Sequence, residues 1–99
     1  MLRIGINGMG RIGRGIYRVN EHQKLFEIVA VNDINPDPNN IAYTLNYDTL
    51  YGRLANPLKC DGHFLVNSVG RNIRVYNEEK IEDVQWGDHD LDFIIDSSG

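Results

Sequence analysis

Cysteine is almost absent from this sequence, in which Cys60 is the single example. One thiol cannot form an intramolecular disulfide bond or a cysteine-rich metal site. An Asp-Gly turn signal follows Cys60, so we interpret it as a structural residue at the end of a strand. The histidines are also few, and His22, His63 and His89 lie far apart with no second ligand at metal spacing. We therefore expect no metal site.

Long apolar runs are missing as well. The longest, around Phe93 to Ile95, is far too short to span a bilayer, and the amino terminus lacks the layout of a signal peptide. We therefore expect a cytoplasmic protein without a membrane partner.

Positive charge is scarce, since 10 Lys and Arg against 14 Asp and Glu leave a formal net charge of −4. This balance argues against nucleic acid as a partner.

A glycine-rich stretch from Ile4 to Arg14 organises the rest of the chain. A short apolar run breaks into Gly-x-Gly-x-x-Gly and continues with a helical pattern, which is typical of a strand, a tight turn and a helix that presents backbone N–H groups to a pyrophosphate. Gly8 permits the turn, Gly10 lets a dinucleotide approach the backbone, and Gly13 lets the helix pack closely on the strand. A chance glycine-rich turn is the alternative.

A second apolar run, from Phe26 to Asn32, ends in Asp33, twenty residues beyond Gly13. A carboxylate at this distance accepts a hydrogen bond from the ribose 2′-hydroxyl of NAD and repels the 2′-phosphate of NADP. The spacing therefore predicts an NAD site. The alternative is that Asp33 only forms the turn before Ile34-Asn35-Pro36.

Several segments of the chain, in order, resemble the amino-terminal part of glyceraldehyde-3-phosphate dehydrogenase. They are Ile6–Arg14, Val31–Asp33, Tyr47–Thr49 with Gly52, Trp86–Gly87 and Asp96–Gly99. The resemblance implies an α/β fold with a Rossmann-type parallel sheet, covering helices and an antiparallel hairpin excursion, as a truncated dinucleotide-binding domain over residues 1–99. It also implies NAD as the cofactor, a homo-oligomer, and phosphorylating oxidation of an aldehyde in glycolysis.

The same resemblance assigns the cofactor-binding residues. Those that match the family's motifs are Asn7, Gly8, Gly10, Arg11, Ile12, Gly13, Asn32, Asp33, Ser97 and Ser98. In the family, Arg11 and Ile12 match residues that act through backbone amides more than through side chains. A solvated charge in the first helical turn is the alternative for Arg11. Ser97 and Ser98 match residues that face the nicotinamide half of the cofactor.

No catalytic residue is expected in these 99 residues. The chemistry that the resemblance implies needs a nucleophilic cysteine, which forms a thiohemiacetal and then a thioester, and a histidine that acts as the base. In the family both lie beyond the position that matches Gly99, and neither Cys60 nor any histidine here matches them. We therefore expect the isolated chain to be inactive, with its catalytic domain absent.

Two other functions remain open. One is a related sugar-phosphate dehydrogenase such as the erythrose-4-phosphate enzyme, although that relative tends to carry glutamate where this chain has Asp33. The other is a stand-alone, non-enzymatic dinucleotide-binding or interaction module. An unpaired edge at the last strand would invite pairing with another chain, so we expect self-association as a dimer or a strand-exchanged assembly.

Periodicity and turn signals predict the elements. We expect Ile12, Ile16 and Val19 to share the helix face that covers the sheet, and Asn39 or Asn40 to cap a short helix that ends near residue 46. The strands are expected at residues 1–7, 28–32, 57–60, 64–67, 73–76 and 91–96, and the first helix from residue 10 or 11 to 23. The strand at 73–76 is expected to return to the parallel sheet. Trp86 is expected to be a packing anchor.

The sequence departs from the family's pattern at a few positions. Leu50 and Tyr51, in a segment interpreted as a loop, stand where the family has threonine and histidine. Glu79, with Lys80 beside it, stands where a cofactor-side arginine usually lies. If that arginine's side chain matters for the adenine, the affinity for NAD should fall, whereas use of its backbone carbonyl alone predicts little change. The alternative is that residues 78–83 form a solvated helical turn.

Overall fold

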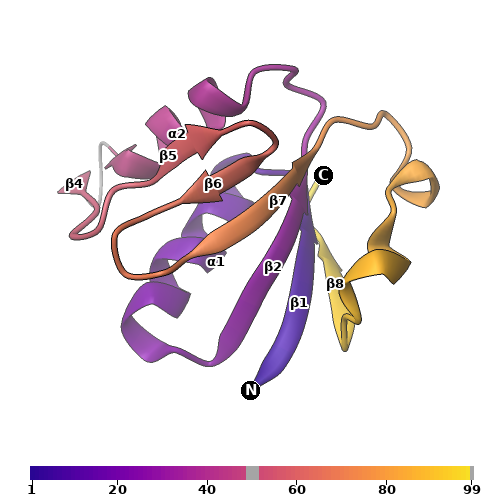
Figure 1. Cartoon of the computed structure of the whole chain (residues 1–99), viewed down its shortest axis with the longest axis horizontal. Helices are drawn as coiled ribbons and strands as arrows, with labels where there is room; N and C mark the ends of the chain where they lie inside the picture. The colour runs from indigo at the N-terminus through magenta and orange to yellow at the C-terminus, as the bar shows by residue number, and fades with distance from the viewer. Residues whose placement is uncertain (49–51, 99) are drawn as a thin grey trace.

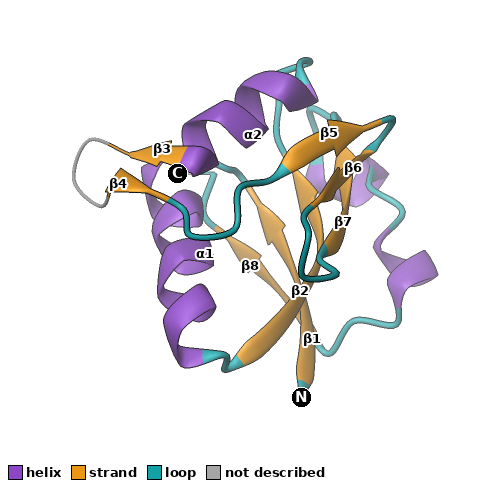
Figure 2. Ribbon diagram, turned by 60° about the vertical axis from the view of Figure 1, so that its left-hand side comes forward, coloured by secondary structure: helices purple, strands orange, loops and turns teal. Residues whose placement is uncertain are grey.

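The computed structural model describes residues 1–48 and 52–98. Thr49, Gly99 and the two family departures at Leu50 and Tyr51 lie outside the described residues. A six-stranded, mostly parallel sheet carries two α-helices on one face and two short 3-10 helices on the other (Figures 1 and 2). This is the α/β architecture that the family resemblance implies.

The main sheet has the strand order β5-β6-β7-β2-β1-β8. Its strands are β1 (Leu2–Asn7), β2 (Phe26–Asn32), β5 (Lys59–Asp61), β6 (Phe64–Val66), β7 (Asn72–Tyr76) and β8 (Phe93–Asp96). The parallel pairs β7-β2, β2-β1 and β1-β8 bring the carboxyl ends of four strands to one edge. The antiparallel pairs β5-β6 and β6-β7 confirm the predicted hairpin excursion, and β7 returns to the parallel sheet as expected.

A second, two-stranded sheet lies where the sequence predicted a loop. Its strands are β3 (Tyr47–Asp48) and β4 (Gly52–Arg53), which pair antiparallel. The prediction of a loop was wrong for these four residues because the backbone groups of the two short segments pair with each other.

The first helix, α1 (Arg11–Gln23), has the predicted bounds, but the prediction of its buried face was wrong. Ile12 and Val19 are 66% and 52% exposed, and only Ile16 of the predicted set packs against the core. The spacing of the predicted set is helical, so the error lies in the phase of the helix and not in its period.

The face of α1 that covers the sheet carries Gly13, Tyr17 and Asn20, each one residue beyond the predicted set. A shift of one residue turns the helix by about 100°. Gly13 is buried at the start of the helix, and the Tyr17 ring is almost fully buried above the sheet. The Asn20 side chain bonds the backbone N–H and carbonyl of Phe26 at 2.9 and 2.8 Å, so it ties the end of α1 to β2.

The second helix, α2 (Pro38–Asn46), begins earlier than predicted. Its N-cap is Asp37, whose carboxylate accepts a hydrogen bond from the backbone N–H of Asn39 at 3.0 Å. Neither predicted cap, Asn39 or Asn40, has that role. Proline at the first helical position is favourable because that position needs no N–H. Pro38 therefore occupies the first position of this helix, directly after the cap.

The hydrophobic core lies between the sheet and the two helices. Its most deeply buried side chains come from β1, α1, β2, α2, β6 and β7, and are Ile4, Ile6, Tyr17, Val31, Leu45, Leu65 and Ile73. Both faces of the sheet are covered near β1, which agrees with the burial of residues 4–6 in β1 and with the continuous apolar run of residues 28–31 in β2.

The other face is covered by η1 (Ile81–Asp83) and η2 (Trp86–His89). The Trp86 ring lies against β1, and a Cβ on Gly5 would be 2.6 Å from a ring carbon. The Trp86 Nε1–H donates to the carbonyl of Ile81 at 3.0 Å, which fixes the ring. Trp86 is therefore the packing anchor that was predicted. Gly5, which the sequence did not single out, makes room for it.

Gly5→Ala is expected to lower the free energy of unfolding by about 1–3 kcal/mol, because the added methyl group overpacks the contact with Trp86. Urea denaturation followed by far-UV circular dichroism measures the change. In a Trp86→Leu background the same substitution should cost less. An equal cost in both backgrounds would show that the indole is not the obstacle.

Candidate functional site

A cleft of about 330 Å³ lies at the carboxyl edge of the parallel sheet, where open α/β sheets bind their ligands. Seven of the ten predicted site residues line it together: Asn7, Gly8, Gly10, Asn32, Asp33, Ser97 and Ser98. Ile34, Glu78 and Glu79 complete the lining. Residues far apart in the chain therefore meet at the position that the glycine motif predicts.

Gly8 forms the turn between β1 and α1. Its φ of +97° lies in the left-handed region, and a Cβ there would be 2.7 Å from the backbone of Ser98. The Gly8 N–H donates to the carbonyl of Asn32 at 2.7 Å, and its own carbonyl accepts a hydrogen bond from Ser97 Oγ at 2.7 Å. The turn is therefore held from both sides, and the side chain of Ser97 supports the glycine loop.

Gly10 and Gly13 are glycines for different reasons. A Cβ on Gly13 would lie 2.2 Å from the carbonyl oxygen of Gly8, so the close packing predicted for Gly13 is present. A Cβ on Gly10 would meet no atom within 4 Å, and Gly10 has an extended backbone with φ −76° and ψ −156° that other residues adopt. The folded chain itself does not require glycine at position 10, so the open space beside it is available to a ligand.

The helix α1 begins beside this open space without a cap. No side chain accepts a hydrogen bond at its N-cap, Gly10, and its first turn contains no acidic residue. The free N–H groups of a helix start carry partial positive charge and suit phosphate oxygens. The side chains of Arg11 and Ile12 do not line the cleft, and Ile12 lines a separate apolar groove. Of Arg11 and Ile12, only the backbone groups at the start of α1 are placed to bind a ligand in the cleft.

Asp33 has the turn-forming role that the sequence offered as its alternative, and it also holds the glycine loop. Its Oδ1 accepts a hydrogen bond from the N–H of Asn35 at 2.8 Å, which forms the turn after β2. Its Oδ2 accepts one from the N–H of Met9 at 2.7 Å, which holds the glycine loop. Each carboxylate oxygen has two lone pairs, so the group can still accept hydrogen bonds from ribose hydroxyls.

Two buried asparagines tie the strand ends together. Asn32 Nδ2 donates to Asn7 Oδ1 at 2.8 Å and to the carbonyl of Glu78 at 3.0 Å, while Asn32 Oδ1 accepts from the N–H of Glu78 at 2.8 Å. Asn7 Nδ2 donates to Asp96 Oδ1 at 3.1 Å. The network links the ends of β7, β2, β1 and β8. Asn7 and Asn32 therefore position the wall of the cleft and use much of their hydrogen-bonding capacity within the protein.

Asp96 accepts three hydrogen bonds on one oxygen. Ser98 donates to it from Oγ at 2.6 Å and from its backbone N–H at 3.1 Å, and Asn7 adds the third. The bonds from Ser98, followed by the one from Asn7, hold the pKa of Asp96 below its ordinary value of 3.8. The ionised form is therefore favoured in the folded chain.

The lowered pKa of Asp96 makes its contribution to stability pH-dependent. The contribution is present above the ordinary value of 3.8 and is lost as the pH falls through the lower folded value. The carboxyl carbon resonance of Asp96 is expected to titrate below 3.8 in the folded chain. Ser98→Ala should move that midpoint upward. A wild-type midpoint at or above 3.8 would contradict the hydrogen-bonded arrangement.

Three lining residues were not among the predicted site residues. Ile34 is 72% exposed at the cleft. Its signal in the sequence was an apolar residue directly after Asp33 and before a turn. Glu78 and Glu79 follow β7, and they reach the cleft because β7 pairs with β2. The family resemblance marks position 79 as cofactor-side, whereas no pattern in the sequence places Glu78 in the cleft.

Other groups lie outside the cleft. Cys60 is in β5, at the edge of the sheet opposite β8, and its thiol donates to the carbonyl of Gly62. Within residues 1–48 and 52–98, no group of three or more His, Cys, Asp or Glu side chains could hold a metal ion. In the same part of the chain, no helix has the length and apolar character needed to cross a bilayer.

Comparison with known proteins agrees with the geometry. The family model "Glyceraldehyde 3-phosphate dehydrogenase, NAD binding domain" matches residues 2–99. Similar proteins include glyceraldehyde-3-phosphate dehydrogenase from Geobacillus stearothermophilus, 39% identical over 98 residues, and glyceraldehyde-3-phosphate dehydrogenase A from Escherichia coli K12, 37% identical over 99 residues, each match covering 99% of this chain. The cytosolic enzyme of Trypanosoma brucei brucei is 36% identical over 99 residues, which is 100% of this chain.

The chain spans 29% of the length of each of these relatives. The family model covers almost all of its residues, and its cleft presents an uncapped helix start, a glycine loop and a carboxylate where a dinucleotide needs them. This chain therefore belongs to the glyceraldehyde-3-phosphate dehydrogenase family, matches that family's NAD-binding domain, and has NAD as its cofactor.

Proposed function

We propose that this chain is the NAD-binding portion of a phosphorylating glyceraldehyde-3-phosphate dehydrogenase of glycolysis, which oxidises an aldehyde and transfers a hydride to NAD. The names of its relatives support the reaction. The observation that carries the proposal is the uncapped start of α1 beside the open space at Gly10, in the same cleft as Asp33.

The residues of the cleft have separate roles in this proposal. The backbone N–H groups at the start of α1, including those of Arg11 and Ile12, bind the pyrophosphate, and Gly10 leaves room for it. Asp33 accepts hydrogen bonds from the adenosine ribose, and the exposed Ile34 offers an apolar surface to the adenine. Ser97 and Ser98 lie toward the nicotinamide half. NAD, when bound, supplies the hydride acceptor.

We further propose that these 99 residues bind NAD without turning over substrate. Among residues 1–48 and 52–98, those that line the cleft include neither cysteine nor histidine, so they offer no thiol nucleophile and no imidazole base. Cys60 lies in β5, which four strands separate from β8 in the sheet. The nucleophile and base of the proposed reaction must therefore come from residues other than these 99.

Calorimetric titration with NAD, and in parallel with NADP, tests the binding proposal. NAD is expected to bind and NADP to bind much more weakly, because the Asp33 carboxylate repels a 2′-phosphate. Absorbance of NADH after addition of glyceraldehyde 3-phosphate, phosphate and NAD tests turnover, and no increase is expected. Failure to bind either dinucleotide would contradict the cofactor role of this cleft in the isolated chain.

We propose a cytoplasmic location, with no nucleic-acid or membrane partner. The relative from Trypanosoma brucei brucei is described as cytosolic, which supports the location. The formal net charge of −4 supports the absence of polyanionic partners, because nucleic acids and anionic membranes attract basic surfaces.

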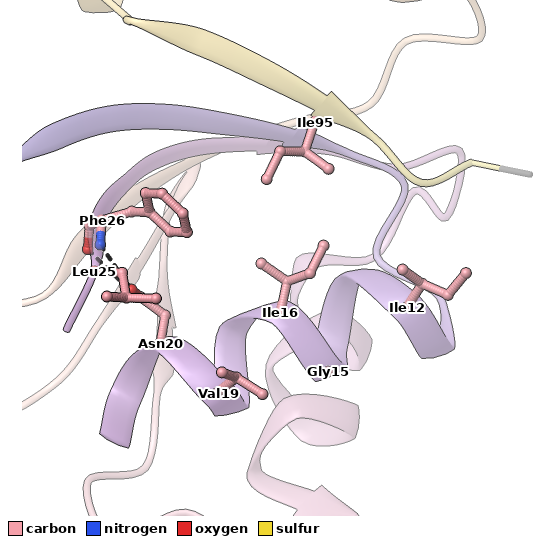
Figure 3. Close-up of a pocket in the computed structure, with 8 residues that line it drawn as sticks. All are labelled: Ile12, Gly15, Ile16, Val19, Asn20, Leu25, Phe26 and Ile95. Carbon is pink, nitrogen blue, oxygen red and sulfur yellow. Dashed lines mark hydrogen bonds between the residues drawn. The ribbon is translucent and has the colours of Figure 1, made fainter. Parts of the chain in front are cut away.

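We also propose that the chain self-associates through β8. This strand pairs with β1, and within residues 1–48 and 52–98 its other edge has no partner. Ile94 is 37% exposed on β8. Beside the strand, Figure 3 shows an apolar groove with side chains from α1, β2 and β8, including Ile12, Val19 and Ile95. An unpaired strand edge next to an apolar groove favours the addition of a strand from a second copy.

Ile94→Lys is expected to shift the chain toward the monomer, because a charge on the strand edge opposes pairing with another strand. Light scattering over a wide range of concentrations measures the mass. Val69→Lys, which changes an exposed apolar residue outside β8 and the groove, is the control and should leave the mass unchanged. A monomeric mass for the wild type at every concentration would contradict self-association.

A further inference from the structure

We propose that Glu79 is a second determinant of selectivity against NADP, which acts through its charge in addition to Asp33. This inference rests on the proposed binding of NAD in the cleft. It concerns a position where the sequence departs from its family, since Glu79 stands where the resemblance predicts a cofactor-side arginine.

The end of β7 brings Glu79 to the cleft. The main chain of Glu78 is clamped to the Asn32 side chain by hydrogen bonds of 2.8 and 3.0 Å. Asn77 Nδ2 donates to the carbonyl of Asp33 at 2.9 Å, and the Asp33 N–H donates to the carbonyl of Tyr76 at 3.1 Å. The segment after β7 is therefore fastened along the end of β2. Glu79 follows these fixed residues and lines the same cleft as Asp33.

The described residues that line the cleft include three carboxylates, Asp33, Glu78 and Glu79, and no lysine, arginine or histidine. Asp33 accepts hydrogen bonds from two backbone N–H groups. Within residues 1–48 and 52–98, the Glu79 side chain takes part in no hydrogen bond or ion pair, and the residue is exposed. No cationic side chain of the described residues therefore forms an ion pair with it.

The negative charge of the cleft should weaken the binding of NADP more than that of NAD. Sites that accept a 2′-phosphate supply an arginine for it, whereas this cleft supplies carboxylates. The 2′-hydroxyl of NAD is uncharged, so the carboxylate of Glu79 opposes the 2′-phosphate without opposing the hydroxyl. Removal of the Asp33 charge alone is therefore expected to leave NADP disfavoured.

The effect of Glu79 should be moderate, because solvent and salt screen an exposed carboxylate. We expect Glu79→Gln to raise the affinity for NADP by about three- to tenfold, which is the size of the interaction between two unit charges about 4 Å apart in bulk water. The affinity for NAD should change by less than about twofold. The gain for NADP should shrink at high ionic strength, since screening weakens the repulsion that the substitution removes.

The test compares three variants with the wild type. Glu79→Gln removes the charge in the cleft, and Glu79→Asp keeps it. Glu82→Gln removes one exposed carboxylate of η1 that does not line the cleft, so it controls for net charge. Calorimetry measures the dissociation constant of NAD, and displacement of bound NAD measures that of NADP, at low and at high ionic strength. Only Glu79→Gln is expected to change the ratio of the two constants.

Each outcome decides the inference. An unchanged ratio in Glu79→Gln, or an equal change in Glu82→Gln, overturns it while the NAD site stands. A loss of NAD binding in Glu79→Gln also overturns it, because the side chain would then contribute to NAD binding itself. If neither the wild type nor any variant binds NAD, the proposed function fails together with this inference. If Glu79→Gln does not fold, Glu79→Ala takes its place with the same expectation.

Discussion

Gly13→Ala is expected to lower the free energy of unfolding by about 3 kcal/mol or more, at the upper end of the cost of overpacking. The added Cβ would lie 2.2 Å from the carbonyl oxygen of Gly8. The main chain fixes the position of this Cβ, and the atom that it would meet is itself a main-chain atom, so neither can rotate away. The Gly8 carbonyl also accepts the hydrogen bond from Ser97 Oγ. If the Gly8 main chain moved to relieve the clash, this hydrogen bond, which supports the turn, would be disturbed. Urea denaturation measures the loss.

Gly15→Ala is the matched control in the same helix. A Cβ on Gly15 would meet no atom within 4 Å, and alanine favours a helix interior over glycine by about 1 kcal/mol. This variant should therefore be as stable as the wild type or more stable. If Gly13→Ala proved equally stable, α1 would not approach the turn at Gly8 as closely as described.

Gly10→Ala is expected to fold normally and to lose at least about tenfold of its affinity for NAD. The backbone of Gly10 has φ −76° and ψ −156°, which alanine adopts, and its Cβ would meet no protein atom within 4 Å. Alanine should raise stability by about 0.4–1 kcal/mol, because it restricts the unfolded chain. The methyl group would instead occupy the space through which the pyrophosphate approaches the main chain.

Thermal unfolding and calorimetric titration with NAD measure the two effects of Gly10→Ala. Gly15→Ala again serves as the control, and its affinity for NAD should match that of the wild type. Unchanged binding in Gly10→Ala would show that the dinucleotide does not approach α1 at this residue. A large loss of stability would show that Gly10 is needed for folding, which its open surroundings do not predict.

Much of the fold follows from local patterns. The spacing of Gly8, Gly10 and Gly13 predicted a strand, a turn and a helix, and α1 begins and ends at the expected residues. The buried face of α1 was predicted one residue out of phase, because Ile12, Ile16 and Val19 have the same spacing as the residues that are buried. Apolar spacing could not show that the helix starts against the main chain of the turn.

Only part of the candidate site was predicted, because the spacing of residues along the chain does not show all the contacts that each of them makes in the fold. Asp33 was found from its distance along the chain, and the structure shows that its carboxylate also holds Met9 and Asn35. The contribution of Glu78 and Glu79 to the cleft depends on the pairing of β7 with β2, which are separated by α2 and the hairpin excursion. The return of β7 to the parallel sheet was predicted and the resemblance marked position 79 as cofactor-side, but nothing in the sequence placed Glu78 in the cleft.

The family resemblance, the strand-turn-helix unit and the carboxylate after the second strand were all predicted from the sequence alone. These depend on the conformational freedom of glycine and on the alternation of apolar residues, which are local properties. The fold was needed to show which face of α1 is buried, that Glu78 lies in the cleft with Asp33 and Glu79, and which atoms a Cβ on Gly13 would meet. Those features depend on strand order and on distances between segments that are remote in the chain.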